Sequence, residues 1–188
     1  MNELHTLLRS IADISDKDWL LFSSKLKRIT FKKKELILST GETESYLSFI
    51  EQGLVRFFIP KVENDMTFAF VFENNFMSAY DSFLTKLPSQ YCIQALTPTT
   101  LYRLTFDDLE KIYQNTNIGN EIGRKCAEEL FLIKSKRELS LLNSSAEERY
   151  LNLFKERPEL IKEIPLKYIA SYIGVTPQAL SRIRRRIS

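Results

Sequence analysis

Apolar and polar residues alternate in short runs through the middle of the chain. Between about residues 31 and 105, runs rich in aromatic and β-branched residues are separated by turn-forming segments such as Thr40-Gly41-Glu42 and Gln52-Gly53. Short strands at such close spacing favour an antiparallel sandwich or barrel over βαβ units. The predicted strands are residues 35–38, 46–50, 54–59, 66–72, 92–96 and 99–104.

On both sides of this region the apolar residues recur at helical spacing. Near the N-terminus, Leu4, Leu8 and Ile11 share one stripe, and Ser15 is expected to cap a second short helix that contains Trp19. After the strands, the pattern predicts helices over residues 106–113, 116–142 and 146–156.

The long helix over residues 116–142 carries an apolar stripe. A stripe of this length fits either core packing or the seam of a two-helix dimer, and we favour the seam because of the C-terminal motif described below. Its members are Ile118, Ile122, Cys126, Leu130, Ile133 and Leu141.

Two short helices joined by a tight turn are predicted over residues 166–185. Gly174 occupies the turn, where a positive φ costs glycine little, and Thr176 and Pro177 are suited to the N-cap and first position of the second helix. The residues expected to face inward are Ile169, Ala170, Ile173, Leu180, Ile183 and Ile187.

The outward face of the second helix is polar and basic. Its members are Gln178, Ser181, Arg182, Arg185 and Arg186. From Ile164 to the end the sequence has five basic residues and no acidic one, whereas the remainder has 22 basic against 24 acidic residues, so the overall charge of +3 hides a strong asymmetry. A concentrated positive face costs stability through self-repulsion and is useful chiefly against a polyanion.

Composition excludes several other classes of protein. The 188 residues are 44% hydrophobic and 27% charged, without an apolar run of about 18 residues, so we expect a soluble, cytoplasmic protein with no membrane span. Cys92 and Cys126 are too few for a disulfide framework or a zinc module, and His5 alone cannot supply a histidine cluster. We therefore expect no metal, no cofactor and no catalytic residue.

The segment from Leu166 to Arg185 resembles a DNA-binding helix-turn-helix. Small Ala170 stands where the two helices cross, Gly174 stands at the turn, and apolar residues including Val175 fill the supporting positions. A terminal helical hairpin with a solvated arginine face is the competing interpretation.

The whole order of elements resembles the family of the cyclic-AMP receptor protein and the fumarate-nitrate regulator (Crp/Fnr). The resemblance rests on KKKELILSTGETESYLSFIEQGLVRFF in the N-terminal half and on IASYIGVTPQALSRIRR in the C-terminal half. It implies an α+β fold: an antiparallel β-roll like a cyclic-nucleotide-binding domain (a double-stranded β-helix), a long dimerisation helix and a helix-turn-helix. The corresponding segments are residues 1–115, 116–142 and 143–188.

The resemblance also implies a function and its site. A homodimer pairing through residues 116–142 would place two recognition helices in successive major grooves of double-stranded DNA, on a palindromic operator. Gln178 and Arg182 fall where the family reads base edges, while Thr176, Ser181, Arg185 and Arg186 are expected phosphate contacts. The wing that flanks the motif in many relatives is expected to be reduced or absent.

The family's phosphate-binding cassette is not matched. Where the family has Gly-Glu-Leu and later Arg-Ser or Arg-Thr, this chain reads Asn74-Asn75-Phe76 and Ser89-Gln90-Tyr91, and Lys86 is the only basic residue between Phe72 and Ala95. Burial of an unpaired phosphate costs several kcal/mol, so cyclic AMP in the usual pose is disfavoured.

An apolar effector is one alternative for the roll. The side chains proposed to line its pocket are Phe76, Met77, Tyr80, Phe83 and Tyr91, although the same residues could equally fill the core of a ligand-free roll.

Two other functions are less consistent with the sequence than a transcription regulator. A cupin-type enzyme needs a histidine cluster that the sequence lacks. A cyclic-nucleotide-like sensor that acts through a protein partner does not account for the acid-free basic tail. We therefore predict a non-enzymatic, DNA-binding regulator.

Overall fold

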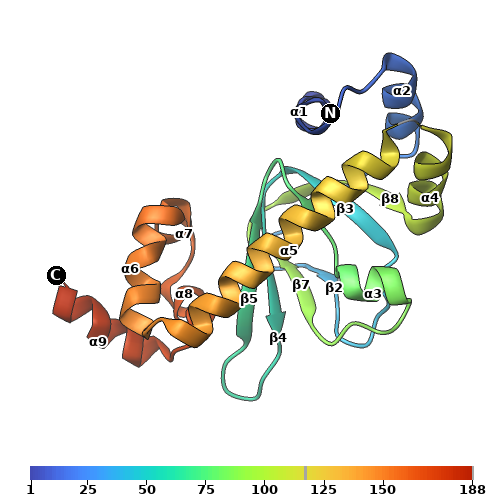
Figure 1. The fold of residues 1–188 in the computed structure, drawn as a ribbon. Coiled ribbons are helices and arrows are strands. Elements are labelled where there is room, and N and C mark those ends of the chain that lie inside the picture. The colour runs from blue at the N-terminus through green and yellow to red at the C-terminus, as the bar shows by residue number, and fades with distance from the viewer. Residues whose placement is uncertain (117, 188) are drawn as a thin grey trace. The chain divides into compact units, whose positions relative to one another are not determined.

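The computed structural model describes residues 1–116 and 118–187 and has an α+β fold, as predicted (Figure 1). Two compact units are distinguished: unit 1 comprises residues 1–57 and 70–128, and unit 2 comprises residues 58–69 and 129–187. The predicted segments 1–115, 116–142 and 143–188 were defined by their expected functions, whereas the two units are defined by packing. The predicted segments therefore remain a prediction. Asn117 and Ser188, which fall within them, lie outside the described residues.

Two four-stranded antiparallel sheets form the roll. One sheet has the order β1-β8-β3-β6 and the other has the order β2-β7-β4-β5. The strands are β1 (Lys27–Phe31), β2 (Leu36–Leu38), β3 (Tyr46–Gln52), β4 (Leu54–Ile59), β5 (Met66–Phe72), β6 (Phe76–Met77), β7 (Cys92–Ala95) and β8 (Thr99–Thr105).

The turn between β3 and β4 requires glycine. Gly53 has a φ of 112°, and a Cβ atom there would lie 2.6 Å from the Thr99 Oγ1 atom. Because both the backbone conformation and the space exclude a side chain, the Gln52-Gly53 turn predicted from the sequence is confirmed on physical grounds.

Three elements were not predicted. Strand β1 is not predicted because four of its five residues are exposed and it has only two apolar residues, Ile29 and Phe31, while β6 has only two residues in all. The short helix α3 (Tyr80–Thr85) was missed because its six residues are too few for a helical repeat.

The core of unit 1 joins the first sheet to five helices: α1 (Asn2–Ile11), α2 (Asp16–Ser24), α3, α4 (Phe106–Asn115) and the first half of α5 (Gly119–Asn143). In Figure 1, α1, α2 and α4 gather near one end of the roll. The Ser15 hydroxyl accepts a hydrogen bond from the Asp18 backbone N–H at 3.1 Å, so the predicted cap of α2 is confirmed.

One part of the predicted dimer seam is wrong. Ile122 is 8% exposed within the core of unit 1, and Ile118 and Cys126 pack against that core. These three residues therefore serve intramolecular packing, which the stripe alone could not distinguish from a seam.

Unit 2 consists of the tip of the β4–β5 hairpin, the second half of α5 and four shorter helices (orange to red in Figure 1). The helices are α6 (Ala146–Glu156), α7 (Pro158–Glu163), α8 (Leu166–Tyr172) and α9 (Pro177–Ile187). Helix α6 begins with a capping box in which Ser145 and Glu148 bond to each other's backbone N–H groups. In the described part of the chain, no helix has the length and apolar character needed to cross a bilayer.

Candidate nucleic-acid interface

Helices α8 and α9 form the predicted two-helix motif around an apolar contact. Five of the six side chains expected to face inward are between 0% and 4% exposed: Ile169, Ala170, Ile173, Leu180 and Ile183. The sixth, Ile187, was predicted wrongly and is 36% exposed, because it stands at the last turn of α9 beyond the helix crossing.

The turn between the two helices has the predicted geometry. Gly174 has a φ of 78°, and the Val175 backbone N–H donates to the Ala170 carbonyl at 2.9 Å. The Thr176 hydroxyl accepts from the Ala179 backbone N–H at 3.2 Å and so caps α9, with Pro177 at the first helical position. A Cβ atom at Gly174 would meet nothing nearer than 3.7 Å, so the positive φ, not lack of space, explains the glycine.

The exposed face of α9 carries the residues expected to contact DNA. Gln178, Ser181, Arg182 and Arg185 are all exposed. Within residues 1–116 and 118–187, Arg182 and Arg185 have no hydrogen-bond or ion-pair partner. The Ser181 hydroxyl already donates to the Pro177 carbonyl at 3.0 Å, which leaves its oxygen as an acceptor.

Arg186 differs from the other predicted contacts. Its guanidinium lies 2.9 Å from a carboxylate oxygen of Glu147 on α6, and the two side chains are 65% and 39% exposed. Exposed ion pairs contribute roughly 0–1 kcal/mol to stability, so Arg186 can readily exchange the Glu147 carboxylate for another anion. An intramolecular carboxylate therefore competes for one of the arginines assigned to phosphate.

Two arginines outside the motif hold its first helix, and sequence reasoning missed both. Arg137 of α5 donates to the Tyr172 carbonyl at 2.8 Å, with its guanidinium carbon 4.0 Å from the centre of the Tyr172 ring. Arg149 of α6 donates to the Ile173 carbonyl at 2.8 Å. Cations at a helix C-terminus satisfy its orphan carbonyls and oppose its dipole, so the two arginines fix the end of α8 beside the turn at Gly174. Because both acceptors are backbone atoms distant in sequence, no local pattern indicates these contacts.

The roll has no arginine where the family's cassette would need one. Asn74-Asn75-Phe76, the segment aligned with the family's Gly-Glu-Leu, lies at the turn between β5 and β6, where Asn74 has a φ of 65°. Helix α3 begins after Ser78-Ala79, and the carboxylate in its first turn, Asp81, accepts a hydrogen bond from the Tyr91 hydroxyl. Lys86 is the C-cap residue of α3, at the other end of that helix. Its ammonium group lies 3.5 Å from the centre of the Phe106 ring.

A buried arginine elsewhere in the roll is already paired. Arg103 of β8 lies 3.4 Å from a carboxylate oxygen of Glu44 and 4.1 Å from the centre of the Tyr46 ring. Burial raises the pKa of Glu44, and the charge of Arg103 opposes that shift only in part. Arg103 therefore balances an internal carboxylate.

The five side chains proposed to line an effector pocket contact different parts of unit 1. Phe83 is fully buried in the core, and Phe76 and Tyr80 pack against that core. Met77 is 3% exposed, while the Tyr91 hydroxyl donates to the Asp81 carboxylate, and burial raises the pKa of that hydroxyl. Packing within the protein accounts for the burial of these groups.

Comparison with known proteins supports the fold. Residues 28–116 match the family model of the cyclic nucleotide-binding domain. A CooA mutant from Carboxydothermus hydrogenoformans superposes with a TM-score of 0.70 at 14% identity, covering 94% of this chain and 80% of that one. The regulator CLP of Xanthomonas campestris, described as c-di-GMP responsive, has a TM-score of 0.71 at 13% identity, with 92% and 91% of the two chains covered.

A putative Crp/Fnr-family transcriptional regulator from Eubacterium rectale has a TM-score of 0.71 at 16% identity, covering 93% of this chain and 84% of that one. No curated protein matches the chain. Residues 28–116, just under half of the chain, thus resemble a cyclic nucleotide-binding domain. With its long helix and C-terminal helices it has the fold of the Crp/Fnr family of transcription regulators, and the resemblance predicted from the sequence is confirmed.

Proposed function

We propose that the protein is a sequence-specific DNA-binding transcription regulator whose helix α9 enters the major groove. The observation that carries the proposal is the exposed arginine pair of Arg182 and Arg185, which has no carboxylate partner within the described residues. A basic face held on a well-supported helix and left without counter-charge is suited to the phosphates and base edges of a duplex.

Individual roles follow from the chemistry of each side chain. Arg182 can donate in a bidentate manner to guanine O6 and N7, and Gln178 can pair with adenine N6 and N7. We assign Thr176, Ser181, Arg185 and Arg186 to the phosphate backbone, where they set position without specifying sequence.

We further propose a homodimer that pairs through the second half of α5, on a face different from the one predicted. Five large apolar side chains there are between 54% and 75% exposed: Phe131, Leu132, Ile133, Leu139 and Leu142. At about 100° per residue, all of them except Ile133 fall within about a 100° arc, which is centred about 130° from the face of α5 that packs into unit 1. Leu132, Leu139 and Leu142 follow heptad a and d spacing, as in the seam of a coiled coil.

Such a dimer has a geometric consequence for its operator. Two recognition helices related by a two-fold axis would read half-sites about 34 Å apart, one duplex turn, and the operator would be palindromic.

We place no effector in the roll. Met77 and Phe83 are 3% and 0% exposed, so a ligand that contacted them would first have to displace protein side chains. Cyclic AMP in the family's usual pose would meet no arginine at the start of α3, and the carboxylate in its first turn, Asp81, already accepts a hydrogen bond from the Tyr91 hydroxyl.

Selection of bound duplexes from a random pool tests the proposed function. We expect an enriched palindrome whose half-sites are centred one helical turn apart. Enrichment without a consensus, together with binding that decays steeply with salt, would indicate non-specific attraction only and would favour the alternative of a sensor that acts through a protein partner.

A further inference from the structure

A groove of about 530 Å³ lies within unit 2, between the second half of α5, helix α6 and the end of α8. Four cationic side chains line it, together with apolar residues that include Leu153 and Ile173. The cations are Lys136, Arg137, Arg149 and Arg157, and the carboxylate of Glu156 is the acidic group in the lining.

Two of these cations are neutralised by carboxylates. The Lys136 ammonium lies 2.9 Å from a carboxylate oxygen of Glu156, and Arg157 pairs with Glu159. Arg137 and Arg149 are bound only to neutral groups of the described chain, namely backbone carbonyls and the Tyr172 ring.

The two uncompensated guanidinium groups are close together. Each donates at 2.8 Å to one of two consecutive carbonyls, those of Tyr172 and Ile173, so both lie at the same end of α8. Burial lowers the pKa of Arg137, and the charge of Arg149 lowers it further. Like charges brought together in a partly desolvated groove repel each other, and an anion placed between them would relieve that repulsion.

We propose that this groove binds a small polyvalent anion, of the class of inorganic phosphates and phosphate-bearing metabolites, between Arg137 and Arg149. The guanidinium fork matches the geometry of phosphate oxygens and retains donors beyond those used on the carbonyls. Lys136 adds positive charge where its exposed pair with Glu156 opens, and the apolar lining provides a surface for the non-phosphate part of a larger ligand.

The location ties this site to the recognition helix. The guanidinium groups that would contact the anion also hold the last carbonyls of α8, immediately before the turn at Gly174. An anion that draws them away from these carbonyls, or holds them more firmly in place, changes how rigidly the turn positions α9. The roll lacks a cation at the start of α3, so the chain offers phosphate a better-matched site here.

Thermal unfolding and calorimetry with inorganic pyrophosphate test the site in the full-length protein, with sodium chloride at matched ionic strength as reference. We expect saturable stabilisation beyond the chloride effect. Arg149→Gln should weaken pyrophosphate binding by about tenfold or more, because one of the two guanidinium groups is lost.

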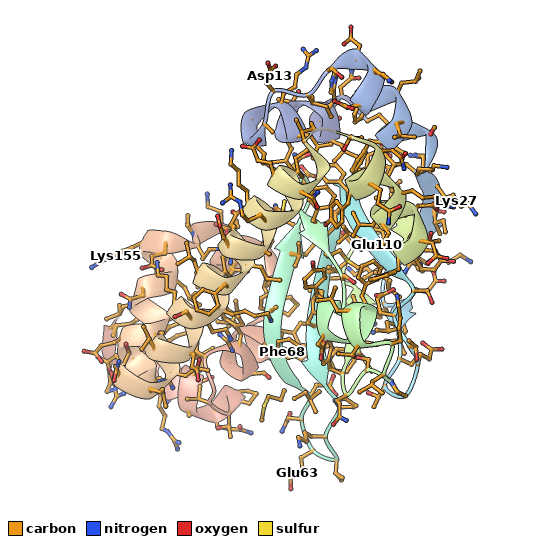
Figure 2. The ribbon with its side chains drawn as sticks, turned by 45° about the vertical axis from the view of Figure 1, so that its right-hand side comes forward. Asp13, Lys27, Glu63, Phe68, Glu110 and Lys155 are labelled. Atoms are coloured by element: carbon orange, nitrogen blue, oxygen red, sulfur yellow. The ribbon has the colours of Figure 1, made fainter. Side chains whose placement is uncertain are left out.

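Two further variants keep the test valid if Arg149→Gln fails to fold. Glu156→Gln releases Lys136 from its exposed partner and should tighten binding by roughly twofold to fivefold. Lys155→Gln removes a charge from the same helix at an exposed position outside the groove, where the side chain extends outward in Figure 2, and should leave binding unchanged.

The proposal fails if pyrophosphate stabilises no more than chloride does. It also fails if Glu156→Gln and Lys155→Gln bind pyrophosphate alike, which would indicate an adventitious ion only. Neither measurement involves DNA, so its result is independent of the proposed regulatory function.

Discussion

Ser171 of helix α8 and Thr67 of strand β5, 104 residues apart, are joined by a hydrogen bond. The Ser171 hydroxyl accepts from the Thr67 backbone N–H at 2.7 Å and donates to the Asp65 carbonyl at 2.6 Å. Thr67 is fully buried, so water does not replace a lost partner readily. A single side chain of the helix-turn-helix thus satisfies two backbone groups of the hairpin whose tip belongs to unit 2.

Replacement of that hydroxyl should therefore destabilise unit 2. Ser171→Ala removes the hydroxyl that bonds to the Thr67 N–H and to the Asp65 carbonyl, at an expected cost of about 1–3 kcal/mol. Hydrogen exchange at the Thr67 amide measures the effect directly and should be faster in the variant.

The control for this substitution is Ser181→Ala. Its exposed hydroxyl bonds only to a carbonyl of its own helix, so its loss should change stability by no more than about 0.5 kcal/mol. Equal stability of the two variants would mean that the hairpin is not held by Ser171.

The ion pair between Glu147 and Arg186 predicts a gain of function. Glu147→Gln removes the competing carboxylate, so binding to duplex DNA should tighten by about twofold at low salt, and the slope of log K against log salt should steepen by up to about one unit. Fluorescence anisotropy over a salt series measures both quantities. Glu163→Gln, on the exposed surface of α7, removes the same charge without affecting Arg186. An identical gain in DNA affinity in that variant would mean that the change in net charge, and not the release of Arg186, causes the gain.

The exposed apolar face of α5 predicts the oligomeric state. Leu139→Glu places a charge in the proposed seam and should convert the dimer into a monomer in sedimentation experiments. Val62→Glu is the matched control, because Val62 is a fully exposed apolar residue on the hairpin rather than on α5. A Leu139→Glu protein that remains dimeric would locate the interface elsewhere.

The environment of Glu51 predicts how unit 1 responds to acid. Burial acts to raise the pKa of Glu51, but hydrogen bonds from Tyr102 and Arg28 and the contact with the N-terminal ammonium outweigh burial and lower it. A carboxyl whose pKa falls on folding stabilises the protein above its unfolded pKa of about 4.3, and that contribution is lost as pH falls through the lowered folded value.

Glu51→Gln should accordingly cost roughly 0.5–1 kcal/mol at pH 7, a small value because the group is partly solvated, and almost nothing near pH 2. Urea unfolding at the two pH values measures the difference. The same loss at both pH values would show that the carboxylate charge is not what stabilises this network.

The parts of the fold that depend on neighbouring residues in the chain were predictable from the sequence. Strands β4 and β5 have the predicted limits because their apolar runs are bounded by Gly53, Pro60 and a polar turn. The helix-turn-helix was predictable because Gly174, Thr176 and Pro177 each act on their own backbone.

Features that depend on distant partners were not predictable. The stripe of α5 was assigned to a dimer seam, yet Ile122 packs into unit 1, since spacing gives the face of a helix but not what covers it. Arg137 and Arg149 donate hydrogen bonds to backbone carbonyls at the end of α8. Every residue has a backbone carbonyl, so no sequence pattern indicates which one an arginine binds. For the same reason the partner of Arg186 was not foreseen.

Arg182 is the residue of α9 that we expect to read base edges, and its contact with guanine is central to the proposed function. Anisotropy titrations should compare Arg182→Ala with the unmodified protein on the selected duplex and on a scrambled duplex of the same length. Loss of a bidentate contact to guanine costs about 1–3 kcal/mol, so the variant should bind both duplexes with the same weak, salt-sensitive affinity. If Arg182→Ala still prefers the selected duplex as strongly as the unmodified protein does, α9 does not read sequence through this residue and the assignment is contradicted.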